Sequence, residues 1–327
     1  MLRRAKAVLT VVAAVACLAT TAACGLGTAA GYTPSGELAG PVKDVDLDGA
    51  SLSVGSKNFT EQLILGKIAV ILMKSAGADV TDLTNIPGSA SARYAQVDGQ
   101  VDMEWEYTGT AWISYLGHTK PIPEEQKQYE AVRDEDLKEN GLVWLKPAPM
   151  NNTYGFATPT ETLKKLGISK LSEIADLPPD QRTFCVESEF KNRNDGFEPM
   201  LKKYGLQLGK DVPQGNVKTL ATGAIYAATD KGECNFGEIF TTDGRIKALD
   251  LTVLEDDRAF FPKYNVATVF RKGVLDEHPE LKDLFAPVSA KLDDKTLIEL
   301  NAQVDVDGRD PVDVAHDWLQ KEGFLAS

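Results

Sequence analysis

From Ser51 onward, short strand-like segments alternate with segments of helical periodicity. The strand candidates at 51–55, 80–86 and 101–107 are separated by two helix candidates, and the first helix begins near Asn58 with Glu61 as its capping partner. A β-α-β-α-β order predicts a mostly parallel sheet, and a second alternating series follows residue 157. We therefore expect an α/β fold, and roughly 280 residues suit two domains better than one core.

The N-terminus has the pattern of an export signal. Residues 1–6 are basic, 8–18 are apolar but too short to span a bilayer, and small residues precede Cys24. This pattern resembles a bacterial lipoprotein signal, in which the Cys becomes the lipid-modified first residue of the mature chain. We expect 1–23 to be a signal peptide, Cys24 the lipidation site and 24–49 a flexible tether. Cys17 is a rival site, and an ordinary secretory signal is the alternative.

Charge and motif content exclude several classes of function. Without residues 1–23, which carry three basic and no acidic side chains, the chain has 32 Lys and Arg against 48 Asp and Glu, a net charge of −16. This balance argues against binding nucleic acid, and against binding anionic lipid by charge. The three His residues fall in no motif with a Cys, and no zinc spacing, Walker loop or dinucleotide fingerprint is present. We expect neither an enzyme nor a cofactor or metal site.

Two cysteines remain for the mature domain. Cys185 and Cys234 form an even pair in a compartment that the export signal makes oxidising. We expect a disulfide between them, with two buried free thiols as the alternative.

The segment 106–110 places a ring and hydroxyls between a strand and a helix. In open α/β sheets, ligands collect at the carboxyl ends of strands. Tyr107 and Thr110 would present an aromatic face beside a hydroxyl, which suits a ligand that is cationic at one end and polar at the other. The alternative is a half-buried tyrosine followed by a threonine helix cap.

Six sequence blocks occur in an order that is familiar from one protein family. The blocks are 55–62 (GSKNFTEQ), 106–110 (EYTGT), 152–154 (NTY), 188–190 (SEF) with Arg193 and 195–196 (DG), 242–246 (TDGRI) and 260–262 (FFP). Over roughly residues 51–325 the chain resembles the substrate-binding proteins of osmoprotectant ABC importers, which bind glycine betaine, carnitine, choline and proline betaine.

The resemblance implies a type II periplasmic-binding fold, with two α/β lobes and a hinge of two crossings. Lobe one would combine 50–150 with 247–327, and lobe two would be 151–246. It also implies a monomeric protein on the extracytoplasmic face of the membrane that delivers its ligand to an ABC permease. Hinge closure around the ligand would assemble the site.

The family encloses the quaternary ammonium in a box of aromatic rings, which attract it by cation–π interaction. The matching positions are Tyr107, Tyr154, Phe240 and Tyr264. Phe240 replaces the tyrosine usual there and lacks its hydroxyl, so we expect a slightly looser box or a bulkier ligand. Phe240 as a core residue and Tyr264 as a surface residue are the alternatives.

The resemblance also implies a pole for the ligand's carboxylate. Lys57, Arg193 and Thr110 match the positions that reach this group. An ion pair with Glu189 or Asp195 is the alternative for Arg193, and a solvated side chain is the alternative for Lys57. Two cations favour a zwitterion such as glycine betaine over choline, while choline, carnitine or another small ligand such as an amino acid remain alternative ligands.

Overall fold

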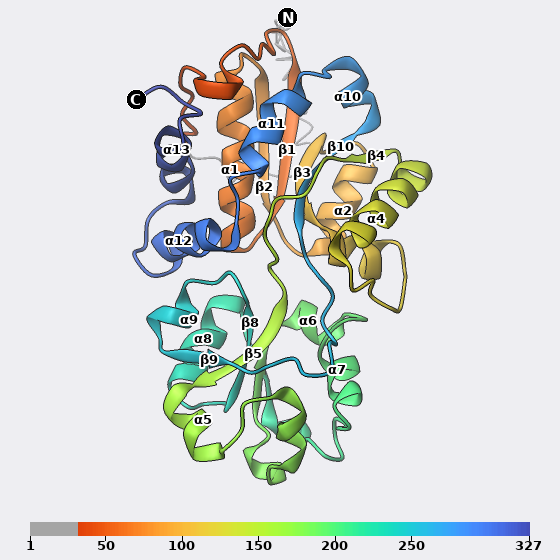
Figure 1. Ribbon diagram of the computed structural model, residues 1–327, viewed down its shortest axis with the longest axis vertical. Helices are drawn as coiled ribbons and strands as arrows, with labels where there is room; N and C mark the ends of the chain where they lie inside the picture. The colour runs from red at the N-terminus through yellow and green to blue at the C-terminus, as the bar shows by residue number, and fades with distance from the viewer. Residues whose placement is uncertain (1–31) are drawn as a thin grey trace, which may run out of the picture.

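The computed structural model describes residues 32–327, which form two α/β lobes, one above the other in Figure 1. Each lobe is built on its own sheet of five strands. Two segments of chain run between the lobes, one from β4 to β5 and one from β9 to β10, and the ends of the described chain both lie at the far side of lobe one (Figure 1). The predicted α/β class with two lobes and two crossings is confirmed.

The sheet of lobe one has the strand order β2-β1-β3-β10-β4. β1 runs parallel to β2 and β3, whereas β10 runs antiparallel to β3 and β4. The strands are β1 (Ser51–Lys57), β2 (Asp79–Ile86), β3 (Met103–Tyr107), β4 (Leu142–Trp144) and β10 (Val266–Arg271). The helices are α1 (Thr60–Ser75), α2 (Ser89–Val97), α3 (Thr108–Thr110), α4 (Glu125–Asn140), α10 (Lys272–Glu277), α11 (Leu281–Ser289), α12 (Asp294–Asp305) and α13 (Pro311–Lys321). α1 is buried over most of its length, because the sheet covers one side of it and α12 and α13 cover another.

The sheet of lobe two has the order β7-β6-β8-β5-β9. Its strands are β5 (Tyr154–Pro159), β6 (Phe184–Val186), β7 (Val217–Thr219), β8 (Phe236–Phe240) and β9 (Leu251–Val253). Its helices are α5 (Thr160–Leu166), α6 (Ser188–Asn192), α7 (Phe197–Lys203), α8 (Thr222–Asp230) and α9 (Arg245–Ala248). Phe156, Phe184, Phe197 and Phe236 meet in a fully buried cluster that forms the centre of this lobe.

Lobe two extends beyond the predicted boundary at residue 246. β9 pairs with β5 in the second sheet, and Leu254 packs in the core of lobe two. The second crossing therefore follows β9 rather than preceding it. After the turn at 241–246, α9 folds the chain back onto lobe two, where Leu251 of β9 is buried.

The prediction of a flexible tether over 24–49 is wrong for the residues from Leu38 onward. Leu38, Val42 and Leu47 are buried in the core of lobe one, and Leu38 forms a β-bridge with Leu325 near the C-terminus. The glycine content of this region predicted flexibility, but its apolar residues cover an end of the lobe. The predicted signal peptide 1–23, Cys17 and Cys24 lie outside the described residues. Within residues 32–327, no helix is both long enough and apolar enough to cross a lipid bilayer.

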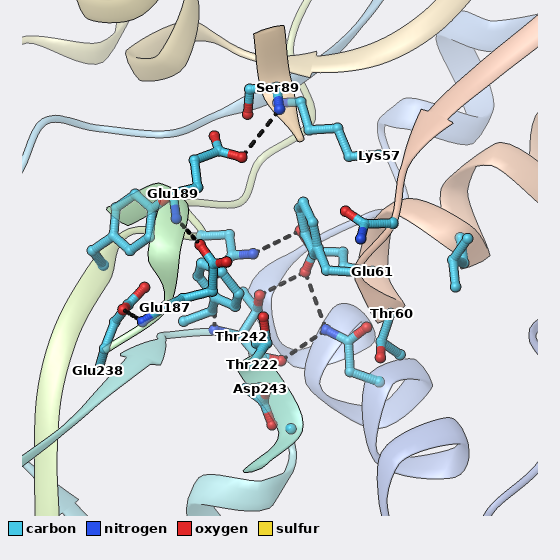
Figure 2. A pocket seen from close by; sticks show the side chains of 18 of the residues that line it. Lys57, Thr60, Glu61, Ser89, Glu187, Glu189, Thr222, Glu238, Thr242 and Asp243 are labelled. Carbon is cyan, nitrogen blue, oxygen red and sulfur yellow. Dashed lines mark hydrogen bonds between the residues drawn. The ribbon is translucent and has the colours of Figure 1, made fainter. Parts of the chain in front are cut away.

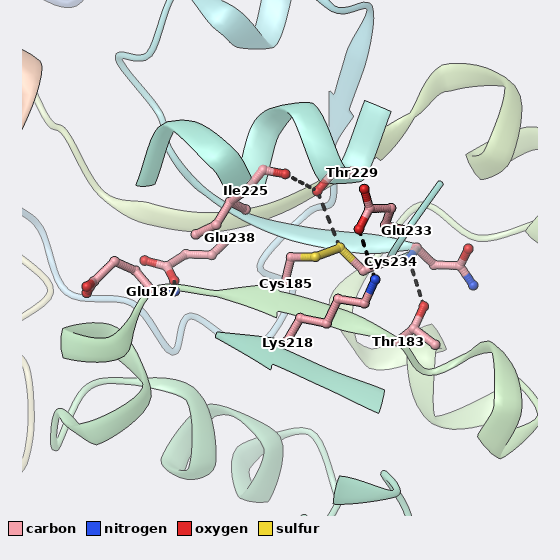
Figure 3. The surroundings of a disulfide bond; sticks show 10 residues. Thr183, Cys185, Glu187, Lys218, Ile225, Thr229, Glu233, Cys234 and Glu238 are labelled. Carbon is pink, nitrogen blue, oxygen red and sulfur yellow. Dashed lines mark hydrogen bonds and ion pairs between the residues drawn. A yellow bond between two sulfur atoms is a disulfide. The ribbon is translucent and has the colours of Figure 1, made fainter. Parts of the chain in front are cut away.

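The structure contains the predicted disulfide between Cys185 and Cys234 (Figure 3). Cys185 lies on β6 and Cys234 lies just before the neighbouring strand β8, which brings their Cα atoms to 5.8 Å. Ile225 and Ala228 of α8 cover the bond, which is buried. The disulfide therefore ties the middle of the second sheet to the turn after α8.

Candidate functional site

A cavity of about 530 Å³ lies between the two lobes (Figure 2). The loops after β1 and β3 line it from lobe one, both crossings contribute, and the starts of α6 and α8 line it from lobe two. Parallel strands place their carboxyl ends at one edge of a sheet, which is why these loops converge. The cavity thus lies where ligands bind in two-lobed α/β proteins.

The turn from β3 to α3 depends on Gly109. A Cβ atom there would lie 2.6 Å from the carbonyl oxygen of Lys263, so only glycine lets the second crossing pass this closely. Thr108 supports the same contact, because its amide donates to the carbonyl of Asn265 at 3.0 Å. Tyr107 and Thr110, on either side of this turn, both line the cavity as predicted from the sequence, and the second crossing brings Tyr264 to the same place.

Five aromatic side chains line the cavity. They are Phe59, Tyr107, Tyr154, Phe240 and Tyr264. The ring centroids are 6.1 Å apart for Phe59 and Tyr107, 5.3 Å for Phe59 and Phe240, 5.3 Å for Tyr154 and Phe240, and 5.5 Å for Tyr154 and Tyr264. The four sequence-predicted rings thus lie around one space. Phe59 was not predicted as a site residue, although it lies in the block 55–62.

Phe59 reaches the cavity because α1 starts later than predicted. The helix begins at Thr60, and Phe59 is its N-cap residue, with extended backbone and no side-chain cap. The predicted cap, Asn58, instead accepts a hydrogen bond from the amide of Gly88 at 3.4 Å, and Glu61 does not reach back to it. The extended conformation at residue 59 turns its ring toward the cavity rather than along the helix.

Glu61 is a buried junction between the lobes. Its Oε1 accepts hydrogen bonds from the Tyr107 hydroxyl at 2.7 Å and from Asn152 Nδ2 at 3.0 Å. Its Oε2 accepts from the Thr242 hydroxyl at 2.6 Å and from Asn301 Nδ2 at 3.1 Å (Figure 2). Burial raises the pKa of Glu61, and these hydrogen bonds oppose the rise. Sequence reasoning missed this role, because an acidic residue in a first helical turn ordinarily indicates a cap.

Lys57 lies at the end of β1 and lines the cavity, although only 3% of the residue is exposed. Its ammonium lies 2.5 Å from Glu106 Oε1 and 5.1 Å from the centroid of the Tyr107 ring. The carboxylate of Glu106 therefore balances this charge. An ammonium has three donors, so further acceptors can still bind Lys57.

Arg193 is not among the residues that line the cavity. Its Nε and Nη2 each donate to Asp195 at 2.7 Å, and its Nη1 donates to Glu189 at 3.3 Å. Its guanidinium carbon lies 5.5 Å from the centroid of the Tyr154 ring, and Tyr264 donates to Asp195 at 2.5 Å. The structure therefore corresponds to the ion-pair alternative for Arg193, which supports two rings of the aromatic group from behind.

Acidic groups predominate on the cavity wall. Six carboxyl groups and two cationic side chains line it. The second cation, Arg245, is held by Asp243, with Nε 2.9 Å from Oδ1, and by Asp305 at 3.3 Å. On lobe two, Glu238 is buried and its Oε2 accepts from the Glu187 amide at 2.7 Å (Figure 2). Burial raises the pKa of Glu238 to about 8.

A comparison with known proteins places the chain among solute-binding proteins. Residues 50–321 match the family model described as the substrate binding domain of ABC-type glycine betaine transport systems. The chain is 39% identical over 283 residues to a glycine-betaine-binding protein of Pseudomonas aeruginosa, covering 84% of this chain and 89% of that protein. It is 32% identical over 275 residues to an ergothioneine transport permease/ergothioneine binding protein of Helicobacter pylori, covering 84% of this chain and 48% of that protein.

Among solved structures, one described as a glycine betaine/carnitine/choline ABC transporter is similar with a TM-score of 0.68 and 27% identity. The match covers 83% of this chain and 98% of that chain. The likeness therefore extends over both lobes and both crossings.

Proposed function

Because the chain belongs to the family of substrate-binding domains of ABC-type glycine betaine transport systems, we propose that it captures a quaternary-ammonium osmoprotectant and delivers it to an ABC permease. Glycine betaine or a related betaine is the proposed ligand. The observation that carries this proposal is the group of five aromatic side chains around one cavity between the lobes.

The aromatic group suits a quaternary ammonium for a simple chemical reason. Such a cation has no N–H, so hydrogen bonds cannot select it, whereas each ring face attracts it by about 0.5–2 kcal/mol depending on desolvation. The acidic wall adds a favourable potential for a cation. Lys57 and Thr110, at the lobe-one end of the cavity, are the proposed partners of the ligand's carboxylate.

Binding is proposed to favour the closed arrangement of the lobes. Phe59 and Tyr107 belong to lobe one, Phe240 belongs to lobe two, and Tyr154 and Tyr264 lie where the two crossings enter or leave the sheets. Only the closed form brings all five rings around a ligand, so the ligand shifts the population toward closure. The closed protein, held at the extracytoplasmic face of the membrane by a lipid on Cys24, then meets its permease as a monomer.

A bulkier betaine is the second candidate. The cavity of about 530 Å³ lies within the range of about 300–1,000 Å³ that holds drug-sized ligands, and glycine betaine is much smaller than those. Ergothioneine, a betaine of a modified histidine and the ligand named for the Helicobacter pylori relative, is therefore a proper comparison compound.

A thermal-shift screen followed by calorimetry tests the proposal. The compounds are glycine betaine, carnitine, choline, ergothioneine and the amino acids proline and glycine. At least one trimethylammonium compound should raise the melting temperature, because ligand that binds only the folded state stabilises it. Glycine, which has the carboxylate of glycine betaine and none of its methyl groups, is the matched control. A shift with amino acids and with no trimethylammonium compound would refute the proposal.

A further inference from the structure

Glu189 reaches across the cleft from one lobe to the other. It belongs to α6 of lobe two, and its Oε2 accepts a hydrogen bond at 3.1 Å from the amide of Ser89, the first residue of α2 in lobe one (Figure 2). A Cβ atom on the preceding Gly88 would lie 3.5 Å from the same oxygen. All three residues line the cavity. The carboxylate of lobe two therefore rests against the start of a lobe-one helix.

The position that Glu189 occupies is favourable for an anion. The first amides of an α-helix have no partner within the helix, and the helix dipole adds a partial positive charge at that end. Lys57 lies on the same side of the cavity and acts on Glu189 by its charge. Burial would raise the pKa of Glu189, but the bond from Ser89 and the charge of Lys57 outweigh it, so that the pKa is lowered and the carboxylate is ionised.

The other carboxyl groups that lobe two contributes to the cavity wall accept no hydrogen bond from lobe one within the described residues. Glu187 accepts hydrogen bonds from the amides of Glu189 and Phe190 in its own helix, and Glu238 accepts from the amide of Glu187. Arg245, the other cation of the wall, is paired with Asp243 and Asp305. Among the lobe-two carboxyl groups of the cavity wall, Glu189 is therefore the one whose negative charge lobe one stabilises.

We propose that Glu189 is an internal competitor for the ligand's carboxylate, and that it sets the preference between zwitterionic betaines and choline. A betaine whose ammonium lies among the rings places its carboxylate toward Lys57 and the start of α2, and must displace Glu189 from Ser89. Choline has no carboxylate, so it leaves Glu189 in place and gains from its charge. This inference rests on the proposed function, since it concerns the same ligands in the same cavity.

Substitutions of Glu189 separate charge from contact. Glu189→Gln removes the charge and keeps an oxygen that can accept from Ser89, while Glu189→Asp keeps the charge and withdraws it by one methylene. Arg193 remains bound to Asp195 through two hydrogen bonds in both variants, so its ion pair survives. Glu198→Gln makes the same change of charge at an exposed residue of lobe two that does not line the cavity, and it is the matched control.

Isothermal titration calorimetry with glycine betaine and with choline supplies the readout. In Glu189→Gln we expect the dissociation constant for glycine betaine to fall and that for choline to rise, so that their ratio changes by about tenfold. In Glu189→Asp we expect the constant for glycine betaine to fall while that for choline stays within about twofold, because the charge remains in the cavity. Glu198→Gln should leave both constants unchanged.

Equal changes for both ligands in the Glu189 variants would mean that Glu189 is only a latch between the lobes, and unchanged constants would mean that it does not act on the ligand. Either result overturns the inference while the proposed function stands. If the unaltered protein bound neither ligand, the proposed function itself would fail for these two compounds.

Discussion

Glu238 allows a sharp prediction about stability and pH. The side chain is 3% exposed, and burial raises its pKa to about 8, whereas the ordinary value in an unfolded chain is 4.5. The negative charge of Glu187 raises the pKa further, and the hydrogen bond from the Glu187 amide opposes the rise. At neutral pH the folded protein therefore holds a proton on Glu238 that the unfolded chain releases.

The sign and size follow from this difference. Below about pH 4.5 both states are protonated and Glu238 has no effect on the pH dependence. As the pH rises toward 8 the unfolded chain ionises first, so the free energy of unfolding falls by about 1.4 kcal/mol per pH unit. Between pH 5 and pH 8 the loss amounts to about 4 kcal/mol, and above the folded pKa it levels off.

Glu238→Gln imitates the protonated carboxyl and should remove this loss. Its amide oxygen can still accept from the Glu187 amide, so folding is preserved. We expect urea unfolding at pH 5 to give similar free energies for the variant and the unaltered protein, and at pH 8 to show the variant more stable by up to about 4 kcal/mol. Glu198→Gln, at an exposed site, should follow the unaltered protein. Parallel curves for Glu238→Gln and the unaltered protein from pH 5 to pH 8 would refute the reasoning.

Three further predictions concern the site and its support. Phe240→Leu keeps apolar volume but loses the ring, and it should weaken binding of glycine betaine by at least about 1 kcal/mol in calorimetry. Tyr94→Leu, at an exposed ring, is the control and should not weaken binding. Equal effects of the two substitutions would exclude Phe240 from the binding site. Glu61→Gln should lower the free energy of urea unfolding by about 1–3 kcal/mol. Each oxygen of Glu61 accepts a hydrogen bond from an asparagine amide, so the new amide group of the glutamine must face one of these donors. An unchanged free energy of unfolding would contradict the hydrogen-bond assignment. Replacing Cys185 and Cys234 together by Ala should lower the free energy of unfolding by about 2–4 kcal/mol in the same assay. Thiol titration of the unfolded, unreduced protein should find neither of these two cysteines free. Two free thiols would exclude the disulfide.

The alternating order of strands and helices could be predicted because it depends on local pattern, whereas the two lobes and their two crossings were predicted from the family resemblance. Strand and helix periodicities gave the alternating order, and the even pair Cys185 and Cys234 gave the disulfide. The boundary near residue 246 was wrong because strand partners are set by tertiary contacts: nothing local to β9 tells which of the two sheets it joins. The tether was predicted too long for a related reason, since the burial of Val42 depends on the shape of the lobe it covers.

The site was predicted in part. Tyr107, Tyr154, Phe240 and Tyr264 were predicted from the family resemblance that the short motifs carry, and they do line one cavity. Charge partners were harder to predict, because an ion pair depends on distances between segments far apart in the sequence. Lys57 is bound to Glu106, which is 49 positions away, and Glu189 meets Ser89 across 100 positions. Arg193 was also hard to predict, although its partner Asp195 is only two positions away. Sequence periodicity does not tell whether the guanidinium points toward the cavity or toward Asp195.

The order of segments along the chain also has a consequence for how the protein folds during its synthesis. Lobe two is one uninterrupted stretch, so all its strands and both halves of its disulfide are present once β9 has been synthesised. Lobe one is different, because β10 lies in its sheet between β3 and β4, α13 packs on α1, and Leu325 pairs with Leu38. Its sheet lacks an interior strand until residue 271 has emerged. During synthesis from the N-terminus, all strands of lobe two are therefore available before the full set of lobe one. The cavity between the lobes forms only after the C-terminal residues of lobe one have been synthesised.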